Sequence, residues 1–150
     1  MRVLGLVLNN PANIQRGSAW KGLSKIQKHK RFCTFESRVY GIRALIVLLR
    51  TYHYKYKLNT IEKVIHRYAP LSENNTYEYI VHVQKWMTEM YNTDGLLGSL
   101  YYVQDNAPFC WFSNPKSLTF ACRCLVKCIC RQETGYVVTD DVLDSAIDLI

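Results

Sequence analysis

The feature that most constrains this chain is a segment near its C-terminus that is apolar on almost every side. In a helix, residues 118–132 would present polar side chains along a single line, formed by Arg123, Lys127 and Arg131. A helix that is apolar nearly all round is buried in a protein core. Gly135 follows at the position where helices commonly end. We therefore predict a buried helix that ends just before Gly135.

Four further segments place apolar residues at helical spacing behind capping residues. They cover residues 37–56, 60–68, 75–91 and 139–150, and Asn114-Pro115 is expected to open the buried helix. Residues 1–31 are expected to be mostly irregular, and residues 32–37 a short extended piece. A chain of 150 residues with 49% hydrophobic residues can build one core. The prediction is an all-α or strongly α-dominated α+β fold of about five helices, as a single domain over residues 1–150.

Six cysteines, four of them within residues 122–130, raise the question of a metal site or a disulfide. The run CRCLVKCIC contains neither Gly nor Pro and lies inside the buried helix, so its four thiols cannot converge on one metal ion. We therefore predict no metal site, no cofactor and a helix face of buried thiols. A disulfide to Cys33 or Cys110 stays open.

The positive charge of the chain is concentrated in one half. Residues 1–75 hold 14 Lys and Arg against 3 acids, a net charge of +11, and residues 76–150 hold 5 against 9, or −4, which gives the total of +7. A cationic half suits nucleic acid, an anionic membrane surface or an acidic cell-wall polymer. No apolar run approaches the roughly 20 residues of a membrane span, and residues 1–10 lack a cleavage site. We therefore expect synthesis in the cytoplasm without a Sec signal, and no membrane span.

Glu133 is the strongest candidate for a catalytic acid. It lies in RQETG at the end of the buried helix, where partial desolvation and the negative end of the helix dipole would both raise the pKa of its carboxyl group. A carboxyl group that stays protonated near neutral pH is what a general acid for glycosidic-bond cleavage needs. The alternative is a solvated glutamate paired with Arg131.

The motif NNPANI supplies three candidate binding residues, Asn9, Asn10 and Asn13. Asparagine side chains near a turn can cap backbone groups. Alternatively, their amides bind a polar ligand, and sugars with N-acetyl groups suit such donors and acceptors. Trp20 would stack on a sugar face, or else belong to the core or its rim.

The segment SENNT, residues 72–76, follows a proline and precedes an expected helix. Glu73 is a candidate second acid and Asn74 a candidate substrate contact, and the alternative for both is a solvated loop position. The four histidines show no paired metal spacing, and the chain has no GxSxG, P-loop or Rossmann glycine pattern. Nucleotide chemistry therefore has no support.

Four stretches of sequence, which carry five motif blocks, resemble a family of small phage and prophage proteins that are described as virion or structural proteins. The stretches are NNPANIQRGSAWKGL, FCTFESRVYGIRALIVLLRTY, NTIEKVIHRYAPLSENNTYEYIVHV and RQETG, in the family's order NNPGNIR, F-x-x-F, GIRAL, WAP-x-x-EN and E-x-G. The chain departs from the family at Ala12, Gln15 and Tyr68, where the family has Gly and often has Arg and Trp. Ala12 restricts the backbone of the loop. The resemblance implies a role in a virion and no mechanism.

A second resemblance, to lysozyme-like glucosaminidases, depends on the order of NNPANI, an F-x-x-F element, GIRALIVLL and a later aromatic-Ala block before a Tyr. In those enzymes the catalytic Glu, in an E-S/T-G-like context, precedes the Asn motif, whereas here RQETG follows it. The resemblance implies a circularly permuted lysozyme-like domain with residues 118–133 as the catalytic helix and residues 9–14 lining the same cleft. It requires Glu133 to lie within about 12 Å of the loop over residues 9–13.

The two resemblances and the candidate residues together predict a peptidoglycan-cleaving glycosidase of the muramidase or lytic transglycosylase type. Glu133 would protonate the leaving oxygen, the three asparagines would orient the sugar, and Tyr68 and Tyr79 would line the groove. The basic half would hold the enzyme on the anionic wall. The protein would act in the periplasm or cell wall of a target bacterium or in a virion, with a virion or immunity protein as partner.

Two other classes of function stay open. One is a non-enzymatic virion or structural interaction module whose helical groove binds another protein. The other is a nucleic-acid binder that uses KIQKHKR and HYKYK. It ranks last because the basic residues are spread over several expected helices and match no known binding fold.

Overall fold

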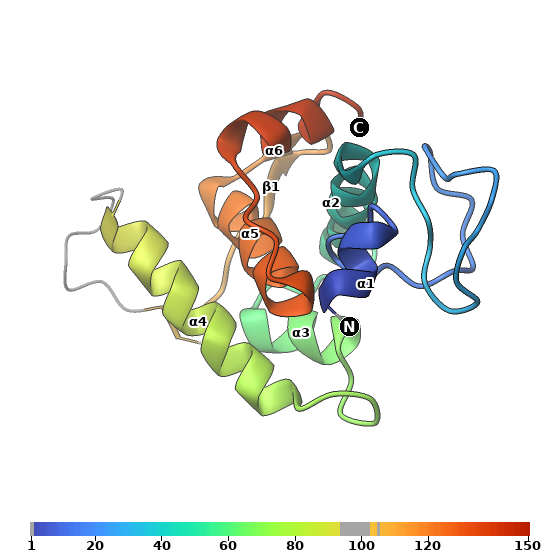
Figure 1. The fold of residues 1–150 in the computed structure, drawn as a ribbon. Coiled ribbons are helices and arrows are strands. Elements are labelled where there is room, and N and C mark those ends of the chain that lie inside the picture. The colour runs from blue at the N-terminus through green and yellow to red at the C-terminus, as the bar shows by residue number, and fades with distance from the viewer. Residues whose placement is uncertain (1, 94–102, 105) are drawn as a thin grey trace. The chain divides into compact units, whose positions relative to one another are not determined.

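Helices dominate the computed structural model of this chain, which describes residues 2–93, 103–104 and 106–150. Over these residues there are six helices and one two-stranded antiparallel sheet (Figure 1). Their order is α1 (Arg2–Val7), α2 (Arg38–Tyr54), α3 (Ile61–Tyr68), α4 (Thr76–Thr93), β1 (Phe112–Asn114), β2 (Ser117–Leu118), α5 (Phe120–Thr134) and α6 (Asp140–Ile147). The predicted α-dominated fold is confirmed.

Side-chain caps begin three of the predicted helices. Thr60 Oγ1 accepts a hydrogen bond of 3.1 Å from the amide N three residues on, at the start of α3. Thr139 does the same before α6, at 3.3 Å. Before α4, Asn75 Oδ1 accepts from the amide N of Glu78 at 3.2 Å, and the Asn75 amide donates to Glu78 Oε2 at 3.1 Å. These bonds satisfy amide groups that have no partner within the helix.

One prediction about local structure was wrong, and one helix lies in a segment that was expected to be mostly irregular. Asn114-Pro115 does not open the buried helix, because Asn114 Oδ1 accepts from Lys116 N at 3.0 Å and forms the turn between β1 and β2. The helix begins at Phe120, after Thr119, whose Oγ1 accepts from the amide N of Cys122 at 3.3 Å. Residues 2–7, expected to be irregular, form α1.

The chain divides into two compact units, which we describe separately. Unit 1 comprises Met1–Leu49 and Ile129–Ile150, and unit 2 comprises Arg50–Cys128. The single domain over residues 1–150 stays a prediction.

Unit 1 is built around the long irregular segment that joins α1 to α2. Two isolated antiparallel bridges, Gln15 with Phe32 and Leu23 with Phe35, tie this segment to itself. Figure 1 shows its loops, in blue and cyan, extending beside α1 and α2. The core of the unit includes the buried side chains of Leu8, Ile14, Phe32, Phe35, Ile42, Leu45, Ile46, Ile129 and Leu143.

Unit 2 packs α3 against α4 and joins the hairpin of β1 and β2 to the preceding loop. The indole N–H of Trp111 donates to Leu58 O at 2.8 Å, and the Trp111 ring stacks on Phe109 with centroids 4.8 Å apart. Tyr91 of α4 meets Phe120 edge-on, at 5.0 Å between centroids. Trp111 and Tyr91 are both buried, so aromatic contacts contribute strongly to this core.

The four cysteines of α5 are buried, as predicted. None of the six cysteines, all of which lie in described residues, forms a disulfide. Burial raises the pKa of the thiols of Cys122 and Cys130 far above the ordinary value, and the nearby charge of Glu133 adds to the effect at Cys130. These two thiols therefore stay protonated and behave as small apolar groups.

Candidate functional site

The loop that follows α1 is held in an unusual backbone conformation by its asparagines. Asn9 and Asn13 both have φ of 54°, in the left-handed region that asparagine tolerates better than most residues. Between them, the fully buried Asn10 donates from Nδ2 to Ile14 O at 2.9 Å and to Cys33 O at 3.0 Å. Asn10 Oδ1 accepts from Ile14 N at 2.8 Å. Asn10 therefore maintains the shape of the loop. Asn9 Nδ2 likewise donates to backbone oxygens, those of Phe35 at 3.2 Å and Glu36 at 3.4 Å.

Two glycines allow the helices to approach this loop closely. A Cβ atom on Gly41 of α2 would lie 2.5 Å from Asn9 O and 3.0 Å from Pro11 Cδ. A Cβ atom on Gly5 of α1 would lie 2.6 Å from Asn13 Oδ1 and 2.4 Å from Thr134 Cγ2. Because any side chain would collide with these atoms, the loop lies directly against the backbones of α1 and α2.

The C-terminal end of α5 is fastened to the same loop. Thr134, which is buried, shares its hydroxyl hydrogen between Pro11 O at 2.7 Å and Cys130 O at 3.1 Å. The helix then ends as predicted, because Gly135 adopts φ of 76° and its amide donates to Arg131 O at 2.9 Å. The residue before Thr134 is thus fixed beside the asparagine loop.

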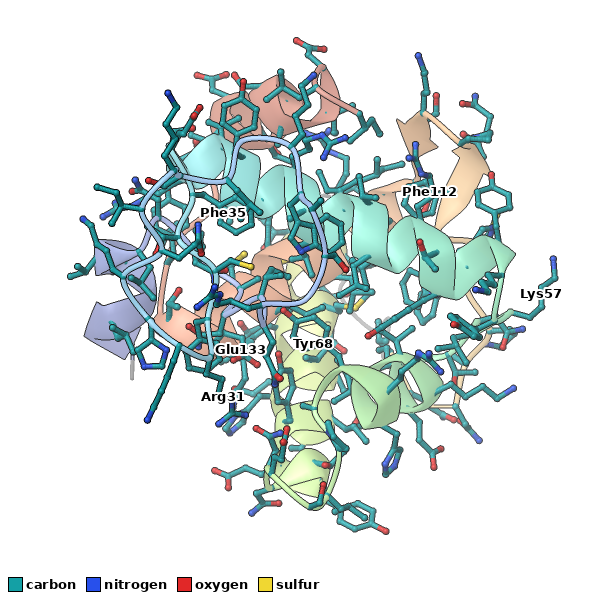
Figure 2. The ribbon with its side chains drawn as sticks, turned by 90° about the vertical axis from the view of Figure 1, so that its right-hand side faces the viewer. Arg31, Phe35, Lys57, Tyr68, Phe112 and Glu133 are labelled. Carbon is teal, nitrogen blue, oxygen red and sulfur yellow. The ribbon has the colours of Figure 1, made fainter. Side chains whose placement is uncertain are left out.

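That residue is Glu133, and its carboxylate meets Asn13. Asn13 Nδ2 donates to Glu133 Oε1 at 3.1 Å and to the backbone oxygen of Glu133 at 3.3 Å. The two residues are 120 positions apart in the sequence, and both are half-buried. Figure 2 labels Glu133 at this end of α5. The structure therefore brings together the candidate acid and the candidate asparagine loop, well inside the separation of about 12 Å that a shared cleft requires.

The pair has the parts of an acid–base site. A carboxyl group held by an amide N–H keeps one orientation, and a half-buried position leaves it accessible to a ligand while weakening its contact with bulk water. Within the described residues, no group of three His, Cys, Asp or Glu side chains could hold a metal ion. The chemistry that these residues can offer is proton transfer and hydrogen bonding.

Trp20 also belongs to unit 1. Its side chain is half-buried, and its indole N–H is buried without a hydrogen-bond partner among the described residues. Asn13 Oδ1 is also buried without a hydrogen-bond partner among the described residues. Because the ring is only partly covered, its burial does not distinguish a residue that stacks on a sugar from a residue of the core or its rim.

The other predicted site residues lie in unit 2. Glu73 and Asn74 are exposed on the loop between α3 and α4, where Asn74 Nδ2 donates to Pro70 O at 3.4 Å. Tyr68 is half-buried at the end of α3, and Tyr79 is buried in the core. The roles of these four residues stay predictions.

Sequence reasoning missed the residues that hold the site together. Thr134 could have been noticed because a hydroxyl directly follows the candidate acid in RQETG. Gly5 and Gly41 interrupt apolar runs in which glycine costs helix stability, and an isolated glycine in such a run often marks a close approach.

Comparison with known proteins relates the chain to phages. No protein-family model matches it. It is similar to a phage protein, with 45% identity over 80 residues. That relative is Protein P5 of Pseudoalteromonas phage PM2, and the match covers 51% of this chain and 50% of the relative. The chain therefore spans about half the length of the curated relative it matches.

Proposed function

We propose that this chain is a phage virion protein with a site that cleaves peptidoglycan, in which Glu133 is the general acid. The similarity to a phage protein supports the virion role. The observation that carries the enzymatic role is the hydrogen bond of 3.1 Å between Asn13 Nδ2 and Glu133 Oε1. The asparagine loop and the end of a buried helix meet at this bond.

In the proposed reaction, the protonated carboxyl group of Glu133 gives its proton to the glycosidic oxygen as the bond to the anomeric carbon breaks. Asn13 holds the carboxyl group in place during the transfer and hydrogen-bonds to the carboxylate that is left. Attack on the anomeric carbon then comes from water or from a hydroxyl group of the same sugar, and the proton that the attacking oxygen loses returns to the Glu133 carboxylate. The proposal also assigns a contact with the sugar to Asn9, which is half-buried on the same loop.

The test compares the release of soluble muropeptides from isolated peptidoglycan by the wild-type chain and by Glu133→Gln. Glutamine keeps an oxygen that can accept from Asn13 but has no acidic proton, so we expect release to fall by at least about 100-fold. Asp144→Asn, an exposed change on α6 of the same unit, is the control and should release as much as wild type. Equal thermal unfolding of the three proteins shows that the fold is preserved.

A non-enzymatic virion role is the second candidate, because the phage relative supports a virion role without any chemistry. If the wild-type chain releases no muropeptides, or if Glu133→Gln releases as much as wild type, the catalytic proposal is rejected. The virion proposal survives that result and is tested separately, on purified particles.

A further inference from the structure

The segment that joins α1 to α2 carries a dense group of exposed cations. The sequence contains no acid before Glu36. We define the cationic loop as residues 15–31, and the side chains of its basic residues are exposed. These are Arg16, Lys21, Lys25, Lys28, Lys30 and Arg31. Glu36 is also exposed, and its backbone N–H donates a hydrogen bond to Gly22 O.

Hydrogen bonds fix the backbone that carries these cations. Arg16 N donates to Arg31 O at 2.8 Å, and Ser24 N donates to Thr34 O at 2.9 Å. Gln27 folds its amide inward, where Nε2 donates to Thr34 O at 2.8 Å and Oε1 accepts from Thr34 N at 2.8 Å. The charges are therefore presented on a defined surface, and less conformational entropy is lost when they bind a partner.

The cationic loop also carries one large apolar side chain that is exposed. Ile26 is 73% exposed, between Lys25 and the inward-facing Gln27, with Lys28 next on the outside. A single exposed isoleucine is common on protein surfaces. Here its exposed neighbours in the sequence are Lys25 and Lys28, and the hydrogen bonds of Gln27 to Thr34 hold the residue next to it in place.

We propose that the cationic loop docks on the surface of an anionic lipid bilayer, with Ile26 entering the boundary between headgroups and acyl chains and the lysines contacting lipid phosphates. This combination of basic residues around an exposed apolar side chain matches peripheral membrane binding. A nucleic acid or an acidic wall polymer could bind the basic side chains, but neither offers an apolar environment for the side chain of Ile26. No helix in the described part of the chain is long and apolar enough to cross a membrane, so the contact would be peripheral.

The test is sedimentation of the full chain with vesicles of phosphatidylcholine alone and of a phosphatidylcholine–phosphatidylglycerol mixture. The proposal expects binding to the mixture and little to phosphatidylcholine. Each lysine near such a surface accounts for about fivefold in affinity, so Lys25→Gln, Lys28→Gln and Lys30→Gln together should weaken binding by about 100-fold. Ile26→Ser should weaken it by about five- to tenfold through lost apolar burial.

Two matched controls use equally exposed positions elsewhere. Val137→Ser removes an apolar side chain that is 77% exposed between α5 and α6. The triple change Lys57→Gln, Lys85→Gln and Lys116→Gln removes three exposed charges from unit 2. Both controls should bind the mixed vesicles within about twofold of wild type, since neither changes a residue of the cationic loop.

Several outcomes overturn the proposal. They are equal binding to both vesicle types, an Ile26→Ser protein that binds like wild type, and control variants that lose as much as the loop variants. Tighter binding to single-stranded DNA or to soluble wall polymer than to the mixed vesicles also overturns it. Glu133→Gln should bind vesicles like wild type, so this result is distinguishable from the failure of the catalytic proposal.

Discussion

At the scale of single residues, Thr134 determines where the candidate acid lies. Its hydroxyl group joins the last turn of α5 to Pro11 O, and its methyl group lies against Gly5. The residue is only 3% exposed, so water cannot replace the hydrogen bond if it is lost. The hydrogen bond between Thr134 and Pro11 therefore holds Glu133 within reach of Asn13.

Replacing Thr134 with valine should therefore weaken the fold and the site together. Valine has nearly the same shape but leaves Pro11 O without this donor, so we expect the free energy of unfolding to fall by about 1–3 kcal/mol. Urea denaturation measures the change. Thr93→Val, at an exposed position at the end of α4, should change stability by less than about 0.5 kcal/mol. A Thr134→Val protein as stable as wild type would show that the bond to Pro11 is unimportant.

At the scale of elements, the site depends on the close approach of α2 to the asparagine loop. Gly41 lies within α2, where alanine would ordinarily stabilise a helix by about 1 kcal/mol. The atom that an added Cβ would meet is the backbone oxygen of Asn9, which cannot move without moving the loop. Packing therefore opposes helix propensity at this position.

When Gly41 is replaced with alanine, we expect the steric clash with Asn9 O to outweigh the gain in helix propensity. We expect the free energy of unfolding to fall by about 1–3 kcal/mol, the usual effect of an overpacked contact, and urea denaturation tests this. Val81→Ala, at an exposed position of α4, is the matched control for a substitution to alanine within a helix. A stabilised Gly41→Ala protein would mean that the loop moves away at little cost.

The sequence predicted those elements whose ends are set by local chemistry. Asn75 and Thr139 begin helices where their side chains cap the backbone, and Gly135 ends one where a positive φ is needed. Helix α1 was missed because it has only six residues, with Gly5 among them, and its apolar run has no helical period. The helix proposed at Asn114 failed because the asparagine forms a turn with the residues after it.

For the candidate site, the sequence supplied the two partners but not the contact. Glu133 and Asn13 were identified from a helix end and an asparagine-rich turn. Their meeting depends on packing of Gly5, Gly41 and Thr134, which no local pattern reports. Asn10 has the same side chain as Asn13, yet it is buried and bonded to backbone groups. Only tertiary contacts distinguish those two roles.

At the scale of the whole molecule, the charge is divided as the sequence indicated, and the structure locates a large part of it. The net charge of +7 hides a first half of +11, from 14 basic residues less 3 acidic ones. Six of those basic residues lie on the cationic loop of unit 1. The excess of positive charge can therefore be tested by single substitutions on one defined surface.

The proposed virion role makes a prediction about the whole molecule in its setting. Particles purified from the host that encodes this chain should contain it in a fixed ratio to the major coat protein, as measured by quantitative mass spectrometry. Retention after a high-salt wash separates a built-in component from one that adheres through its charge, because screening weakens adhesion between exposed charges. Absence from washed particles would reject the virion role and leave the catalytic proposal standing.

The bond between Asn13 and Glu133 also has a consequence for biosynthesis. Its partners are 120 residues apart, so one leaves the ribosome long before the other is made. At the usual rates of synthesis, the delay is roughly 6 to 24 s. Throughout that interval the asparagine loop exists without its acid. A nascent chain therefore cannot assemble the pair before residue 133 has left the ribosome, and premature termination before residue 133 yields a protein that lacks the proposed acid.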